Sequence, residues 1–472
     1  MAKIAIIGAG SIVFCKTLLN DMFRTEALDG STYALMGPTM SKLERMKSYA
    51  ETIVRKNSLK AKVYATTDRK EALKGADYVI TMFQIGGVEA FGLDYEIPMK
   101  YGVDQCIGDS LGPGGVFRGL RTMPVMVDML EEMEELCPEA IVLNYVNPMA
   151  TVCLGMGRAS DFPFVGLCHG VQTTLDLIAG YVGVPRDQIE YVAAGINHMA
   201  WFLKIEKDGV DLYPKLKANF EKPQYYVNEK VRGEVMRHFG YFMTESTGHL
   251  SEYLPWFRKN KKALDLYCDQ PSFGGETGAY YKWCRDIKEK YREVDFLERE
   301  PGELEPRSKE YCSYILEALE SGRPFKFNGN VMNYGYITNL PYDACVEVPV
   351  YADKSGLHPL VVGELPPQLA ALNQSNITVQ SLAAQAALDG DPELVVAAVA
   401  LDPLTGAVQT LKEVRDMCIE MLEAEKQWLP QFQGRALKPS PTISIPKGTK
   451  GVPDPLDPAL AIVHRFGKLA EK

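Results

Sequence analysis

Residues 3–11 read KIAIIGAGS, a short apolar run that ends in a glycine-rich turn. Apolar residues at helical spacing follow as far as about Arg24, so the segment predicts a strand, a tight turn and a helix. This pattern opens a Rossmann unit, in which glycines let backbone N–H groups and the helix N-terminus approach a pyrophosphate. Val13 stands where the third glycine of GxGxxG would be, so a turn that binds no ligand is the alternative. We favour dinucleotide binding. The predicted contacts are Gly8, Ala9, Gly10 and Ser11.

Strands and helices alternate through the first 200 residues. Apolar runs of strand length recur between helical segments, which is typical of an α/β protein with a doubly wound parallel sheet. These runs lie at 32–36, 62–66, 78–83, 140–144 and 164–167. The run at 32–36 is followed by Gly37 rather than the acid that usually binds the adenosine ribose, so NADP stays open beside NAD, which we prefer. Gln84 directly follows the run at 78–83, in a turn predicted to lie beside the cofactor.

The regular alternation breaks down from about residue 214, where the chain becomes richer in aromatic and charged side chains. We therefore predict three parts. They are a Rossmann domain at 1–200, a mixed α+β substrate-binding and oligomerisation domain at 201–435, and a proline-rich tail at 436–472 that is extended or disordered.

The composition of the 472 residues excludes several classes of protein. A net charge of −10 without a basic run argues against nucleic acid or an anionic membrane as a partner. No apolar segment approaches the length that crosses a bilayer, and residues 1–10 lack the pattern of a secretory signal. The ten cysteines are scattered without a CxxC pair, so they form neither a disulfide framework nor a structural zinc site. We expect a reduced, cytoplasmic protein.

Two short apolar runs each end in a possible metal ligand. VGLCHG at 165–170 carries Cys168, and AAGINHMAW at 193–201 carries His198. Strands of such a sheet deliver side chains into a ligand-binding crevice at their carboxyl ends. A single cysteine in an apolar run is usually a packing residue. Because a dinucleotide pattern opens the same chain, we interpret the pair as ligands of a metal ion beside a nicotinamide.

Two further segments carry polar residues at sites suited to a ligand. The glycine-rich loop at 107–118 includes Asp109 and Arg118, which are either solvated or in contact with substrate. The strand at 140–144 ends in Asn144, and Asn147 follows before a proline. These amides suit hydroxyl groups of a sugar or of the nicotinamide ribose, although an Asn-Pro turn at a helix start is common.

Six motifs in one order resemble glycoside hydrolase family 4, the NAD- and manganese-dependent glycosidases, and most of all its bacterial α-galactosidase branch. They are GAGS at 8–11, GDSLGPGGVFRGLRT at 108–122, NYVNPMA at 144–150, CHG at 168–170, GINHMAW at 195–201 and ESTGHLSEYLPWF at 245–257. The resemblance covers about residues 3–432. It implies a fold related to lactate and malate dehydrogenases, and a homodimer or homotetramer.

The resemblance also implies a mechanism. Most glycosidases use two carboxylates, and the NAD-dependent ones are an exception. NAD+ would take hydride from C3 of an α-glycoside, the C2 proton would then be removed, the aglycone would leave by elimination, water would add, and NADH would return the hydride. Mn²⁺ or another divalent cation would act as a Lewis acid at the C2 and C3 oxygens. The family's metal ligands fall on Cys168 and His198.

Other roles carry over by position in the motifs. His169 is the implied general acid. Asp109 matches an acidic position near the site. The base at C2 falls on Tyr253, which we rank ahead of Glu252. Substrate contacts fall on Asn147 and Arg307, although Arg307 is equally an ion pair at a helix start.

Several alternatives stay open. The residues Cys168-His169-Gly170 match a group that includes α-glucosidases, whereas the longer motifs resemble the α-galactosidases. An α-galactoside is therefore the expected substrate, with an α-glucoside, a galacturonide or a glucuronide as alternatives. His169 takes the place of the acid or amide of the phosphosugar branches, so the sugar is expected to be unphosphorylated. A plain NAD-dependent 2-hydroxy acid dehydrogenase is an alternative from another class, but it would leave Cys168 and the large second domain unexplained. A non-catalytic nucleotide or sugar sensor is a third alternative.

Overall fold

The structure is a computed structural model that describes residues 1–293, 304–441, 443–451, 462, 466 and 467. The chain divides into two compact units, residues 1–438 and residues 439–472. The tail predicted at 436–472 overlaps the second unit, and its residues 442, 452–461, 463–465 and 468–472 lie outside the described part of the chain.

Described strands of the first unit form one sheet in the order β3-β2-β1-β4-β5-β6-β10-β11-β7-β8-β9, with β12 paired to β11. Their bounds are β1 Lys3–Ile7, β2 Thr32–Met36, β3 Lys62–Thr66, β4 Tyr78–Thr81, β5 Ile141–Asn144, β6 Phe164–Gly166, β7 Glu190–Ile196, β8 Met199–Lys207, β9 Val210–Asp211, β10 Phe325–Met332, β11 Cys345–Asp353 and β12 Gly356–Pro359.

Strands β1 to β6 pair in parallel, which confirms the predicted doubly wound sheet. The side chains of Ile4 to Ile7 are buried because helices cover a parallel sheet on both faces, and this accounts for their continuous apolar run. Beyond β6 the pairing is antiparallel, through β10, β11, β7 and β8. The sheet therefore begins as a Rossmann unit and continues as a mixed sheet.

Helices connect and cover these strands. Their bounds are α1 Ile12–Phe23, α2 Met40–Lys56, α3 Arg69–Leu73, α4 Gly87–Lys100, α5 Gly112–Leu136, α6 Met149–Ala159, α7 Gly170–Val182, α8 Tyr213–Phe220, α9 Pro223–Tyr226, α10 Lys230–Phe239, α11 Thr247–Tyr253, α12 Lys261–Tyr267, α13 Ala279–Glu293, α14 Tyr311–Ser321, α15 Pro367–Asp389, α16 Pro392–Leu401, α17 Pro403–Val408 and α18 Leu411–Ala424. No helix in the described residues is both long enough and apolar enough to cross a bilayer.

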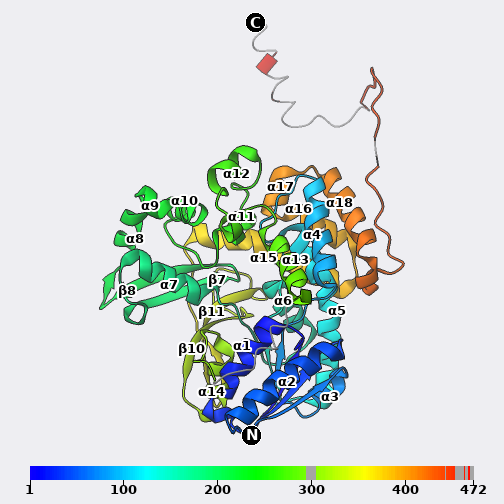
Figure 1. The fold of residues 1–472 in the computed structure, drawn as a ribbon. Helices are drawn as coiled ribbons and strands as arrows, with labels where there is room; N and C mark the ends of the chain where they lie inside the picture. The colour runs from blue at the N-terminus through cyan, green and yellow to red at the C-terminus, as the bar shows by residue number, and fades with distance from the viewer. Residues whose placement is uncertain (294–303, 442, 452–461, 463–465, 468–472) are drawn as a thin grey trace. The chain divides into compact units, whose positions relative to one another are not determined.

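The two halves of the first unit share the sheet. Helix α1 packs against α2 and α14, and α5 packs against α3, α6 and α15. Figure 1 shows α7 to α10 gathered around β8, where a second apolar core includes Val171, Leu216 and Phe242. The boundary predicted between residues 200 and 201 falls inside β8, which pairs with β7 along its length. Residues 1–438 form one compact unit, without a division at this position.

The turn after β1 is shaped by a close approach. Gly8 has a φ of +99°, and a Cβ atom there would lie 2.7 Å from the backbone of Met82 at the end of β4. Only glycine fits this conformation and this spacing. Backbone N–H groups of Gly8 and Ala9 both donate to the carbonyl of Met36, which ties the turn to the end of β2. Ser11 then precedes α1 without its side chain capping the helix, so first-turn N–H groups stay open to an anion.

Candidate active site

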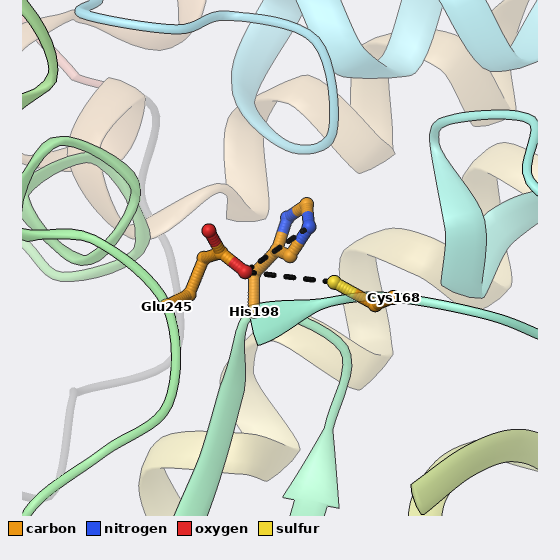
Figure 2. A group of neighbouring side chains, drawn as sticks. All are labelled: Cys168, His198 and Glu245. Carbon is orange, nitrogen blue, oxygen red and sulfur yellow. Dashed lines mark hydrogen bonds and ion pairs between the residues drawn. The ribbon is translucent and has the colours of Figure 1, made fainter. Parts of the chain in front are cut away.

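Three potential metal ligands converge from three separate segments. Cys168 follows β6, His198 lies in the turn between β7 and β8, and Glu245 precedes α11 (Figure 2). The Cys168 sulfur is 3.5 Å from Oε2 of Glu245, and Nε2 of His198 is 4.0 Å from the same oxygen. One donor atom from each residue lies within 4.8 Å of the other two. The spacing fits ligands around one ion.

The backbone is strained at two of these three residues. His198 has a φ of +62° and Glu245 a φ of +72°, in the left-handed region that residues other than glycine rarely adopt. Such strain persists where surrounding structure enforces it, and it concentrates at functional sites. Gly170 makes room for the cluster, because a Cβ atom there would lie 2.1 Å from Oε2 of Glu245.

The surroundings of Glu245, His198 and Cys168 shift the pKa of each side chain, and these shifts bear on cation binding. Burial opposes ionisation of Glu245, but His198 and His249 bring its pKa down to about 2. Burial, together with His249, lowers the pKa of His198 to about 4, so the imidazole is neutral at pH 7. Burial and the charge of Glu245 raise the pKa of Cys168 well above its usual value. A cation would reverse that last shift by stabilising the thiolate.

A second cluster adjoins the first. Asp109 accepts a hydrogen bond from Ser110 at 2.6 Å and one from Asn147 at 3.2 Å, and it lies 3.7 Å from the guanidinium of Arg118. Burial opposes its ionisation, yet Arg118 and nearby histidines lower the pKa of Asp109 below its usual value. Nε2 of His249 is 3.9 Å from Asp109, which joins the two clusters.

Tyr253 completes the junction. Its hydroxyl lies 3.3 Å from Nδ1 of His198, and the His198 and His249 rings are 4.2 Å apart between centroids. Burial raises the pKa of Tyr253. Two buried polar atoms nearby, Oδ1 of Asn147 and Nη1 of Arg118, have no hydrogen-bond partner in the described chain. Buried polar groups are nearly always paired in native proteins, so these atoms fit a polar ligand.

Several predicted site residues make contacts that favour other roles. Glu252 is buried, and its carboxylate accepts backbone N–H groups of Cys106, Ile107 and Gly108, so these contacts favour a loop-anchoring role over a base. Arg307 pairs with Glu317 and lies over the Tyr314 ring at 3.6 Å. Its place in substrate binding stays a prediction.

The predicted cofactor contacts Asn144 and Gln84, and the predicted general acid His169, differ in solvent exposure. The Asn144 side chain is fully buried, accepting from the Thr81 hydroxyl at 2.8 Å and donating to the Val146 carbonyl, so it fixes the end of β5. Gln84 is partly exposed and donates to the carbonyl of Gly87 at 3.2 Å. His169 is exposed at the start of α7, beside Cys168. Cofactor contacts by Asn144 and Gln84 stay predictions.

Glu245 and His249 are the residues that sequence reasoning missed as parts of the site. Both lie in the motif at 245–257, in which the resemblance gave a role only to Tyr253 and Glu252. Tertiary pairing places them here: Phe202 and Phe242 share a backbone hydrogen bond of 2.9 Å, and Thr244 donates to the Ala200 carbonyl at 2.7 Å. This short ladder brings Glu245 alongside the turn that holds His198.

Comparison with known proteins identifies the family. Residues 3–184 match the model of family 4 glycosyl hydrolases, and residues 193–405 match the family's C-terminal domain. An α-galactosidase of Bacillus subtilis is 41% identical over 92% of this chain and 100% of its own length. An α-galactosidase of Rhizobium meliloti is also 41% identical, over 91% of this chain and 89% of its own length.

Two solved structures have the same fold. A putative glucosidase of Bacillus subtilis superposes with a TM-score of 0.79 at 26% identity, over 89% of this chain and 100% of that one. A 6-phospho-β-glucosidase of Thermotoga maritima, solved with manganese, NAD+ and glucose-6-phosphate, superposes with a TM-score of 0.73 at 20% identity, over 90% of this chain and 98% of that one. Both halves of the chain match, and the chain belongs to glycosyl hydrolase family 4.

Proposed function

We propose that this protein is an α-galactosidase that works with NAD+ and a divalent cation such as Mn²⁺. The observation that carries the proposal is the convergence of Cys168, His198 and Glu245 beside Tyr253, in a chain whose sheet begins as a Rossmann unit. Two α-galactosidases at 41% identity favour galactose as the sugar. An α-glucosidase of Erwinia rhapontici, 28% identical over 90% of this chain and 98% of its own length, makes glucose the alternative.

The donor set suits the cation. A carboxylate and an imidazole are common ligands of Mn²⁺, and the softer thiolate is acceptable in a mixed set. Cys168, His198 and Glu245 would hold the ion, which when bound would polarise sugar oxygens and stabilise negative charge on them. NAD+ would accept and return a hydride, and the uncapped start of α1 beside the Gly8 turn suits its pyrophosphate.

The chain's own residues divide the remaining work. Tyr253, whose hydroxyl lies 3.3 Å from Nδ1 of His198, would accept the proton from C2 of the sugar after its own phenol proton has been lost, a loss that a bound cation would favour. Oδ1 of Asn147 and Nη1 of Arg118, which have no hydrogen-bond partner in the described chain, can orient sugar hydroxyls. His169, exposed beside Cys168, would protonate the departing oxygen. Burial of His198, Tyr253 and Asp109 keeps bulk water from the reacting carbons.

The test is a panel of nitrophenyl α-galactoside, α-glucoside and α-galacturonide with NAD+, Mn²⁺ and a thiol reductant. We expect nitrophenol release to be fastest from the galactoside, with no net accumulation of NADH. Stoichiometric NADH production would instead identify a dehydrogenase. Faster release from the glucoside would keep the chemistry and change the sugar.

We also propose that the protein works in the cytoplasm as a homodimer or homotetramer. All ten cysteines are free thiols, which suits a reducing compartment. Sedimentation equilibrium would measure the number of subunits, and a monomer at micromolar concentration would contradict the assembly. Fractionation of cells that carry a tagged chain would test the location.

A further inference from the structure

Three aromatic side chains form a partly exposed shelf on α13 and the 3₁₀ turn Ser272–Gly274. The Tyr280 and Trp283 rings stack with centroids 5.9 Å apart, and Phe273 lies 6.1 Å from Tyr280 and 6.5 Å from Trp283. Trp283 is 48% exposed and Phe273 37% exposed, whereas Tyr280 is half-buried. Exposed rings grouped in this way mark binding surfaces more often than isolated apolar residues do. Phe273, Tyr280 and Trp283 together form the aromatic shelf.

The segments that carry the aromatic shelf pack against segments of the active site. A Cβ atom on Gly248 would lie 2.7 Å from the carbonyl oxygen of Phe273, so the backbone of Phe273 packs on the residue before His249. The backbone N–H of Tyr280 donates to the Cys106 carbonyl at 3.1 Å, three residues before Asp109.

A buried ring links the shelf to the charged pair of the site. Phe91 meets the Tyr280 ring edge to face at 5.4 Å, and the Arg118 guanidinium lies 5.7 Å from the Phe91 centroid. The shelf therefore adjoins the Asp109, Arg118 and His249 side of the site.

The surroundings of the shelf do not suit a subunit interface. Its exposed neighbours on α13 are charged, namely Arg285, Asp286, Glu289 and Lys290. Stable interfaces bury about 800 Å² per partner, and charged residues are depleted at their centre. Two exposed rings surrounded by charged side chains provide too little apolar surface for a stable subunit interface. They are large enough to cover one face of a single sugar ring.

We propose that the aromatic shelf binds the leaving group of the glycoside, specifically a second pyranose. This inference rests on the proposed glycosidase function and extends it to the aglycone. A pyranose has an apolar face of C–H groups that packs on an aromatic ring, while its edge carries hydroxyls. Lys282 and Glu276, paired at 2.8 Å beside the shelf and partly exposed, offer hydrogen-bonding groups for those hydroxyls.

The test compares two α-galactosides that differ only in the leaving group: methyl α-galactoside and a disaccharide with glucose as the aglycone. We expect Trp283→Ala to lower kcat/KM for the disaccharide by about 3- to 10-fold, the value of one lost ring contact. The value for the methyl glycoside should stay within about twofold of the wild type, because methanol does not reach the shelf. Trp283→Phe should restore most of the loss.

Trp256→Ala is the matched control. Trp256 is 39% exposed and stacks on Phe239 at 5.6 Å in a separate cavity of about 580 Å³, which is lined by residues of α10 and α12 and none of the site residues named above. Its substitution should leave the ratio of the two substrates unchanged.

The outcomes separate the two proposals. If wild-type protein hydrolyses neither galactoside, the proposed glycosidase function is refuted, and the proposed role of the shelf is refuted with it. If both are hydrolysed but Trp283→Ala lowers them equally or not at all, only the shelf is overturned. A change in molar mass of Trp283→Ala, measured by light scattering, would also overturn it by making the shelf a subunit interface.

Discussion

Gly170→Ala tests whether Glu245 is a third protein ligand of the metal. The added Cβ atom would lie 2.1 Å from Oε2 of Glu245, where 3.4 Å is an ordinary contact, so the oxygen must retreat by about 1.3 Å. Metal–ligand distances tolerate deviations of roughly 0.2 Å. The carboxylate therefore cannot keep its place in the cluster. Cys168 and His198 are not displaced, since the new atom lies 3.5 Å from the Cys168 sulfur.

The expected result is weaker metal binding in a folded protein. We expect Mn²⁺ affinity to fall at least about tenfold, the lower end of what perturbing a ligand's support costs. Unfolding free energy should change by less than about 1 kcal/mol, because the atom that must move is the end of a flexible side chain and alanine favours helix. Electron paramagnetic resonance of free Mn²⁺ gives the affinity, and urea unfolding gives the stability.

Gly180→Ala is the matched control for this experiment. Gly180 lies on the same helix, is exposed, and has no atom within 4 Å of the position a Cβ would take. Its substitution should leave metal affinity unchanged. Glu245→Gln should reproduce the loss, and adding it to Gly170→Ala should cost little more, because both remove one interaction. Equal Mn²⁺ affinity in Gly170→Ala and wild type would refute the assignment of Glu245 as a ligand.

Further predictions concern protons and buried charges. Burial raises the pKa of Glu347 from 4.5 to about 8, an effect that stabilises the fold below pH 4.5 and is lost as pH rises through 8. Metal-free Glu347→Gln should therefore lose less stability than wild type between pH 5 and pH 8, by about 3.5 kcal/mol in urea unfolding. Mn²⁺ binding at pH 7 should release about one proton from Cys168, seen by calorimetry in two buffers, and Cys168→Ser should abolish the release. Tyr253→Phe should lower kcat by roughly 10²- to 10⁴-fold while changing Mn²⁺ affinity less than about tenfold; a small loss of kcat would exclude Tyr253 as the base. Arg121→Met should cost about 3–5 kcal/mol in unfolding, because it leaves two buried carboxylates unpaired; a neutral effect would contradict the ion pairing.

Much of the fold could be predicted because its signals are local. The run Lys3–Ile7 and the turn at Gly8 encode a strand and a close backbone approach within a few residues. The other parallel strands are likewise marked by short apolar runs. No local sequence pattern marked the domain boundary that was predicted at residue 200. Whether β8 continues the sheet or opens a new domain depends on pairing with β7, and sequence periodicity does not specify a strand's neighbours.

The sequence by itself predicted Cys168 and His198 as metal ligands, because thiol and imidazole side chains at the ends of apolar runs fit a metal beside a dinucleotide. Only the tertiary structure decided which acidic residues accompany them. Glu245 reaches the site because residues 242–244 pair with residues 200–202, whereas Glu252 on the following helix is bound by three backbone N–H groups. Both acids lie in one polar motif within seven residues of each other. Their separation depends on contacts some 45 and 145 residues away in the chain, which no local pattern contains.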